Sequence, residues 1–228
     1  MPPPVLATQI TKFLFNLKLH SLPPNAIETL FPFADEATKQ ACRAFYGKYY
    51  SDNRPRYCII GINPGRFGGG VTGIPFTDPI RLQQECGIGN TWQKKQELSS
   101  VFVYEVIKAF GGPKAFYSKF YITSVSPLGF TKDGKNLNYY DDKELIQTIR
   151  PFAVDCLQQQ LNWGLHRTTA FCFGDGKNFK FLSQLNKEHG FFEQIIPLSH
   201  PRFIMQYKLK QKELYIEKYL EAFSTVTI

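Results

Sequence analysis

Two side chains that could do chemistry stand where strand-like apolar runs end. Asn63 follows the run 57–62 and precedes a proline, which biases its backbone away from the helical region and holds the side chain at the strand end. His200 follows the run 192–198 and also precedes a proline. An amide offers a hydrogen-bond donor and an acceptor, and so does a neutral imidazole. These two residues are the first candidates for a reactive site.

The loop after the first of these runs is rich in glycine. Five glycines lie among residues 61–70. Because glycine has no Cβ, it lets the backbone approach a ligand closely and present N–H groups to it. The loop lacks the Gly-Lys-Ser/Thr ending of a P-loop and the GxGxxG spacing at the start of a helix. It therefore indicates a ligand pocket of another kind.

Two further loops add polar and basic side chains. Ser124 lies near the end of the run 120–125, and a short polar turn follows it; by itself this pattern is typical of an ordinary strand exit. Directly after the candidate histidine, the chain places Arg202, Phe203 and Met205 close together. A cation beside bulky apolar tips is the composition of a wedge that enters a stack of bases. This loop therefore points to a nucleic acid as the ligand.

The elements that must position these loops alternate along the chain. Apolar, β-branched or aromatic runs predict strands at 57–62, 120–125, 168–173 and 192–198. Amphipathic segments predict helices at Leu6–Leu19, Asp35–Tyr49, Ser99–Phe110, Asp141–Leu161 and Asn178–Glu188. A final helical face is predicted through Leu209, Ile216, Leu220 and Phe223. Strands that are apolar on both faces and alternate with helices predict a parallel sheet covered on both sides.

We therefore expect a three-layer α/β/α fold with a central, mainly parallel four-stranded sheet. It would form one domain over residues 1–228, with residues 1–30 as a helical extension packed on it. In such sheets, ligands bind outside the carboxyl ends of the strands. The loops after three of the strands should then meet at one rim.

The composition excludes several classes of protein. Hydrophobic residues make up 43% of the chain and charged residues 20%, which supports a substantial core and argues against disorder. The five cysteines are widely separated and form no CxxC pair, so we expect no metal, no redox centre and no cofactor. No apolar run is long enough for a membrane helix, and no secretory signal begins the chain. We expect an intracellular protein without a membrane partner, in the cytoplasm or nucleoid if the source is bacterial.

The charge balance favours a polyanionic partner. Lysine and arginine number 27 against 19 aspartates and glutamates, which gives a net charge of +8. Neutralising phosphates releases counterions and so gains free energy. The basic residues are scattered along the chain, however, and a basic surface that serves only solubility is the alternative.

Together the three loops resemble motifs of the uracil-DNA glycosylase superfamily, and most closely those of its single-strand-selective monofunctional family. The first motif of that family reads Gly-Met-Asn-Pro-Gly and continues through Phe-Gly to Thr-Gly-Val-Pro-Phe. Residues 61–76 are similar to it without a gap. The Pro-Leu pair at 127–128 and the His-Pro pair at 200–201 follow in the same order as in the family.

Two departures from the family bear on specificity. The family has an asparagine that reads the Watson–Crick edge of uracil where this chain has Ser124. A serine hydroxyl cannot reproduce both the donor and the acceptor of an amide, and its smaller size would admit larger deaminated bases. The second motif is also two residues shorter, because His200 and its proline lead directly to Arg202.

The resemblance implies a role for each candidate residue. Asn63 would orient a water beneath the sugar carbon, and a neutral His200 would donate a hydrogen bond to the departing base. The base would bind against Ile62, Gly65, Gly69, Phe76 and Ser124, with Phe76 as the stacking ring. Contacts to DNA would come from Ser199, Arg202, Phe203 and Met205. No lysine in the three loops resembles a Schiff-base nucleophile, so strand cleavage is not expected.

The function implied is a monofunctional glycosylase that excises uracil from DNA in base excision repair and leaves an abasic site. Its partner would be single-stranded DNA, with double strands left open, and the protein would act as a monomer. Two alternatives remain at this point. One is a glycosylase that prefers xanthine, hypoxanthine or another deaminated base, and the other is a non-catalytic nucleic-acid-binding module.

Overall fold

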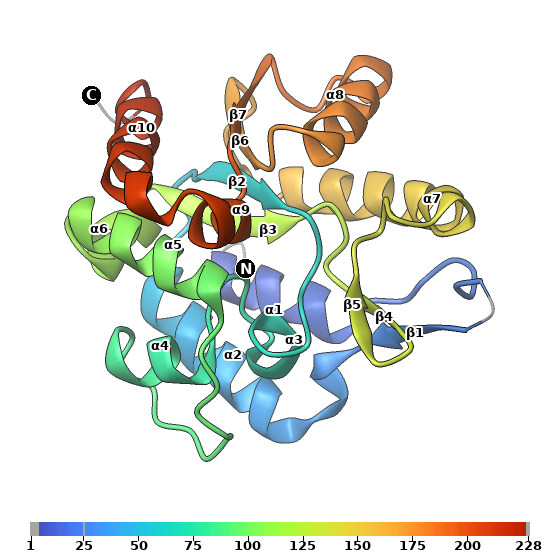
Figure 1. Ribbon diagram of the computed structural model, residues 1–228, viewed down its shortest axis with the longest axis horizontal. Helices are drawn as coiled ribbons and strands as arrows, with labels where there is room; N and C mark the ends of the chain where they lie inside the picture. The colour runs from blue at the N-terminus through green and yellow to red at the C-terminus, as the bar shows by residue number, and fades with distance from the viewer. Residues whose placement is uncertain (1–4, 25, 227–228) are drawn as a thin grey trace.

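The computed structural model describes residues 5–24 and 26–226, and its centre is a four-stranded parallel sheet (Figure 1). The strands pair in the order β3-β2-β6-β7. They are β2 (Tyr57–Gly61), β3 (Phe120–Ser124), β6 (Thr169–Phe173) and β7 (Gln194–Leu198). All residues of β3 and β6 are buried, as strands covered on both faces must be. The predicted parallel sheet is confirmed.

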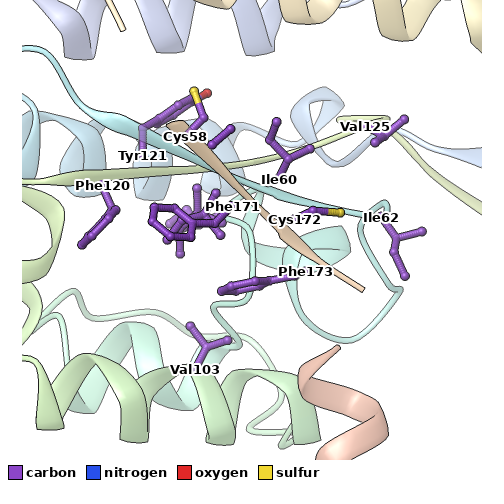
Figure 2. Packing of buried hydrophobic residues seen from close by; sticks show 14 of the residues in the cluster. Cys58, Ile60, Ile62, Val103, Phe120, Tyr121, Val125, Phe171, Cys172 and Phe173 are labelled. Carbon is purple, nitrogen blue, oxygen red and sulfur yellow. The ribbon is translucent and has the colours of Figure 1, made fainter. Parts of the chain in front are cut away.

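Aromatic rings fill the space between one face of this sheet and the helices over it. These helices are α5 (Leu98–Ala109), α6 (Pro113–Tyr117) and α10 (Lys212–Ser224). The ring centroid of Phe223 lies 4.6 Å from that of Phe120 and 5.0 Å from that of Phe171. Figure 2 shows these two strand residues on the side of the sheet that faces Val103 of α5. Burial of large rings makes this layer a major source of stability.

The opposite face carries a second helical layer. It consists of α2 (Glu36–Tyr49), α7 (Lys143–Leu161) and α8 (Lys177–His189), with α1 (Leu6–Phe15) packed on α2. The hydroxyl of Tyr121 in β3 donates to Gln160 of α7 over 3.0 Å. Asn178 of α8 donates to the carbonyl of Phe173 over 3.1 Å. The two layers confirm the predicted α/β/α architecture.

The predicted helix boundaries differ from the observed ones mainly where a cap or a turn intervenes. Asp35 is the N-cap of α2, and its carboxylate accepts hydrogen bonds from two backbone N–H groups of the first turn. The first helix ends at Phe15, short of the predicted Leu19. Leu209, predicted on the buried face of the last helix, lies instead in the 3₁₀ turn η2 (Leu209–Gln211) and is 57% exposed.

A small antiparallel sheet was not predicted. It has the strand order β1-β4-β5, with β1 (Ile27–Leu30), β4 (Gly129–Lys132) and β5 (Lys135–Leu137). Strands of three or four residues are too short to show a reliable alternation of polar and apolar side chains. The Asp133-Gly134 pair, with φ of +50° and +66°, forms the turn between β4 and β5. An Asp-Gly pair is a hairpin signal, so this turn could have been found from the sequence.

The segment after His200 was predicted to be a loop, and this prediction is wrong. Residues Pro201–Tyr207 form the helix α9, which packs against α5. Proline suits the first position of a helix, since its missing N–H needs no partner there and its φ is already helical. The remaining short elements are η1 (Pro32–Ala34), α3 (Gly69–Thr72) and α4 (Pro79–Gln84). Across residues 5–24 and 26–226, no helix has the length and apolar character needed to cross a membrane.

Candidate active site

The carboxyl ends of β2, β3 and β7 meet at one cavity of about 70 Å³. Eight predicted residues line it: Ile62, Asn63, Gly65, Gly69, Phe76, Ser124, His200 and Arg202. A larger cavity of about 660 Å³ lies between α1 and α7, and none of the predicted residues lines it. The parallel sheet thus brings together residues from three loops that are far apart in the sequence, at the edge where such sheets bind ligands.

The side chain of Asn63 is held by the main chain on both sides. Its Oδ1 accepts a hydrogen bond from the N–H of Tyr139 over 3.0 Å. Its Nδ2 donates to the carbonyls of Leu137 over 3.2 Å and of Pro64 over 3.3 Å. These contacts fix which end of the amide is oxygen, and they leave Oδ1 one further acceptor position. The segment that follows β5 therefore orients Asn63, a contribution that the sequence pattern did not reveal.

His200 is the N-cap residue of α9. Its Nδ1 accepts a hydrogen bond from the N–H of Arg202 over 3.1 Å, so the neutral ring carries its proton on Nε2. Burial and, to a smaller extent, the charge of Arg202 lower the pKa of His200 to about 4, against an opposing effect of Asp175. Near neutral pH the ring is therefore an uncharged donor whose N–H is directed by a cap.

Phe76 lies over the end of β2 in an unusual backbone conformation. Its φ is +52°, which a bulky side chain rarely adopts. Its ring centroid lies 5.4 Å from that of Phe173 and 5.9 Å from that of His200. A Cβ on Gly61 would approach the ring of Phe76 to 2.9 Å, so glycine at this position makes room for the ring. Phe76 and His200 consequently share one wall of the cavity.

Ser124 ends β3 and is only 5% exposed. It is the register partner of Gly61 in β2, and its Oγ would lie 3.5 Å from a Cβ at that glycine. Ser124 therefore lines the cavity, as Phe76 does.

Glu97 also lines the cavity, and sequence reasoning missed it. Its Oε2 accepts a hydrogen bond from the hydroxyl of Ser100 over 3.1 Å, and a Cβ on Gly68 would lie only 1.8 Å from the same oxygen. Burial raises the pKa of this carboxyl to about 7; the hydrogen bond from Ser100 and the charge of Arg202 act in the opposite direction, and Asp78 raises it. No local pattern marks this glutamate, because only the fold brings it against the glycine-rich loop.

Among the residues that the structure describes, no group of three histidine, cysteine, aspartate or glutamate side chains could hold a metal ion. The five cysteines are all buried, and burial raises the pKa of Cys58 and of Cys172 to about 12. These thiols pack as small apolar groups.

Comparisons with known proteins decide the family. The model of the Uracil DNA glycosylase superfamily matches residues 48–224. The chain belongs to this superfamily. The chain is also similar to the wild-type SMUG2 of Pedobacter heparinus, whose crystal structure matches with a TM-score of 0.95 and 47% sequence identity over 98% of both chains. A search of curated proteins found no match.

Membership in the uracil-DNA glycosylase superfamily confirms the predicted resemblance. It identifies the chain as a DNA glycosylase, a hydrolase of N-glycosidic bonds that works on DNA in base excision repair. Residues at the ends of β2, β3 and β7, where the resemblance lies, line the cavity together with Glu97, Ser99, Asn136 and Asn138.

The residues predicted to contact the DNA of this glycosylase have different surroundings. Arg202 and Phe203 are exposed on the first turn of α9, and Arg202 also lines the cavity. Met205 is partly buried against the hydrophobic core. Ser199 donates to Asp175 over 2.7 Å, and its carbonyl accepts from the hydroxyl of Tyr219. The structure thus groups Arg202 with Phe203 at the rim and gives Ser199 the contacts of a residue that holds the segment before α9.

Proposed function

We propose that this protein hydrolyses the N-glycosidic bond of uracil in DNA and leaves an abasic site without cutting the strand. The observation that carries the proposal is the pairing of Asn63 and His200 in one cavity, each oriented by backbone hydrogen bonds. Groups held in this way need no reorganisation when charge develops during the reaction.

The target base must leave its stack to reach this cavity. Phe76 would then stack on the base, and the backbone between Ile62 and Gly69 would line its edges. In a dissociative reaction the glycosidic bond breaks before water attacks, and the departing base carries negative charge. The Nε2–H of neutral His200 would donate to a carbonyl oxygen of that base, as a donor of an oxyanion hole does.

Asn63 would position the water that attacks the sugar carbon. An amide cannot act as a general base near neutral pH, so its contribution is orientation. Two carbonyls hold its Nδ2, and the N–H of Tyr139 occupies one acceptor position of Oδ1. The remaining acceptor position of Oδ1 can receive a hydrogen bond from the water.

The side chains that line the cavity support a reaction without strand cleavage. A lyase reaction needs an amine nucleophile, and none of the described residues lining the cavity is a lysine. We extend the proposal to single-stranded DNA as the preferred substrate and to a monomer of one domain. The support is the similarity of residues 61–76 to the single-strand-selective family.

The test uses a labelled single-stranded oligonucleotide with one uracil, incubated with excess protein and then treated with hot alkali. We expect a cut band with the wild type and a rate about 10²–10³ lower for His200→Ala, as for the loss of one oxyanion-hole donor. Asn63→Ala should also lose activity. The exposed residues Asn162 and His189 supply matched controls, and their alanine variants should cut as the wild type does. Equal cutting by all four variants would refute the proposed roles.

A deaminated purine is the second candidate substrate, and Ser124 is the observation that favours it. The serine leaves the space that an asparagine would fill at the end of β3 and offers one hydroxyl in place of an amide. We expect Ser124→Asn to raise the rate on uracil relative to the rates on xanthine and hypoxanthine. The ratio is measured on three oligonucleotides that differ only in the damaged base. A ratio unchanged by the substitution would show that Ser124 does not set base preference.

A further inference from the structure

A groove of about 460 Å³ lies beside the base cavity. The two share four lining residues: Glu97, Ser99, Asn136 and Arg202. A DNA strand that places one base in the cavity has to continue over the rim of the cavity. This groove is one of two paths along which the DNA can leave the rim. The other path is a groove of about 440 Å³ that shares Ile62, Asn138, His200 and Arg202 with the cavity.

The charges of the two grooves differ. Arg66, Lys135 and Arg202 line the first, where the acid among the described lining residues is Glu97. The second is lined by two acids, Asp141 and Asp175, which balance Lys177 and the shared Arg202; Lys177 lies 3.8 Å from Asp141. Phosphates are therefore favoured in the first groove.

Phe67 stands at the first groove with two cations over its ring. The Nζ of Lys95 lies 3.6 Å from the ring centroid, and the Cζ of Arg66 lies 4.5 Å from it. Both cations are exposed, and an exposed cation is held only weakly by an aromatic face. When phosphates arrive, the two cations can move to them and leave the ring free for a base. A ring bordered by cations is the usual composition of a site for single-stranded nucleic acid.

The loop that carries Phe67 is anchored before any ligand binds. The N–H of Arg66 donates to Oδ1 of Asn136 over 3.1 Å. The carboxylate of Glu97 occupies the space where a side chain at Gly68 would lie. The hydrogen bond and the close packing of Glu97 on Gly68 hold this part of the glycine-rich loop against the groove that Phe67 lines.

We propose that this groove binds the nucleotides next to the extruded one, with Phe67 stacking on a neighbouring base and Arg66, Lys95 and Lys135 contacting its phosphates. The inference rests on the proposed function, since it takes the cavity as the site of the extruded base. It adds a second contact to DNA, on the glycine-rich loop and apart from α9.

The test measures fluorescence anisotropy of a labelled single-stranded oligonucleotide with one tetrahydrofuran abasic analogue at its centre, which the enzyme cannot hydrolyse. Phe67→Leu keeps apolar bulk and removes the ring, and we expect it to weaken binding about tenfold. Phe67→Trp should bind within about twofold of the wild type. Lys135→Ala should reduce the slope of log K against log salt concentration by about 0.7.

Tyr215 and Lys218 on α10 provide the matched control. The Nζ of Lys218 lies 5.3 Å from the ring centroid of Tyr215, in a cation–aromatic pair that lines neither groove. We expect Tyr215→Leu and Lys218→Ala to leave the affinity and the salt slope unchanged. Thermal melting of each variant verifies that Phe67→Leu is folded at the assay temperature.

Uracil release under single-turnover conditions separates the two proposals. If the wild type releases no uracil while Phe67→Leu still loses affinity, the proposed reaction fails and the groove assignment stands. If the wild type releases uracil but folded Phe67→Leu binds as tightly as the wild type, the groove assignment is overturned. An unchanged salt slope in Lys135→Ala would also overturn it.

Discussion

Glu97 is a carboxyl group that the fold keeps partly out of water at the edge of the cavity. Its pKa of about 7 in the folded protein compares with 4.5 for an ordinary glutamate. Between these pH values the folded state holds a proton that the unfolded state has released. The free energy of unfolding therefore falls as pH rises through this window, and the contribution of the proton is lost above pH 7.

Replacing Glu97 by glutamine tests this sign. Glutamine stays neutral at every pH, so Glu97→Gln should match the wild type near pH 4.5 and exceed its stability at pH 8. Partial exposure screens the charge, and we expect a gain of about 1 to 2 kcal/mol at pH 8. Urea denaturation at the two pH values measures it. If the stability difference between Glu97→Gln and the wild type is the same at both pH values, the carboxyl of Glu97 does not titrate between them.

The pKa of His200 is shifted downward, and this shift bears on the proposed reaction. With a pKa of about 4, the ring stays neutral throughout the range in which Glu97 titrates. Any change in excision rate between pH 5 and 8 should then belong to Glu97 and disappear in Glu97→Gln. The single-turnover rate of the variant, measured against pH, checks this. A slope that persists near pH 6.5 would show that His200 titrates as an ordinary histidine.

At the scale of elements, the small antiparallel sheet and the segment after it orient the amide of Asn63. Leu137 ends β5, and its carbonyl, together with the N–H of Tyr139, binds the side chain of Asn63. The hydroxyl of Tyr139 in turn donates to Oδ1 of the buried Asn178 over 2.8 Å. A change in the β4-β5 turn, whose residues 133 and 134 do not line the cavity, should therefore alter the excision rate through Asn63.

Gly134→Ala makes that change. Gly134 has φ of +66°, and a Cβ there would meet no atom within 4 Å, so the substitution strains only the backbone. We expect a loss of about 1 kcal/mol of stability and a slower excision rate. Gly89 is the matched control, because a Cβ there also meets nothing and no positive φ constrains it. If both alanine variants behave alike, the hairpin does not position Asn63.

At the scale of the whole molecule, the two helical layers make the rim of the sheet a rigid support. Phe120 and Phe171 pack on Phe223 on one face, while Tyr121 is bonded to Gln160 on the other. Ser124 ends β3, Asn63 follows β2 and His200 follows β7, so strands of this one sheet carry all three residues. The chain has a net charge of +8. Part of its positive charge lies in the groove beside Phe67, where it would attract a polyanion toward the cavity.

The sequence by itself determined the parallel sheet, the order of its main elements and the family. A strand that is apolar on both faces is stable only when it is buried between two layers. This apolar pattern lies within a few consecutive residues, so the sequence alone reveals it. The motif around Asn63 and the His-Pro pair are also local, so they could be recognised without coordinates. The Asp133-Gly134 hairpin signal is local as well.

The tertiary structure decided what depends on contacts between distant segments. The burial that holds His200 neutral, the carboxyl of Glu97 at the cavity and the support of Asn63 from the segment after β5 all join parts of the chain that are far apart. The helix after His200 also depends on tertiary structure. His200 caps it and α5 packs against it, and these contacts show that Pro201 begins a helix. Local patterns report which residues are apolar or polar, and only packing decides which of them meet.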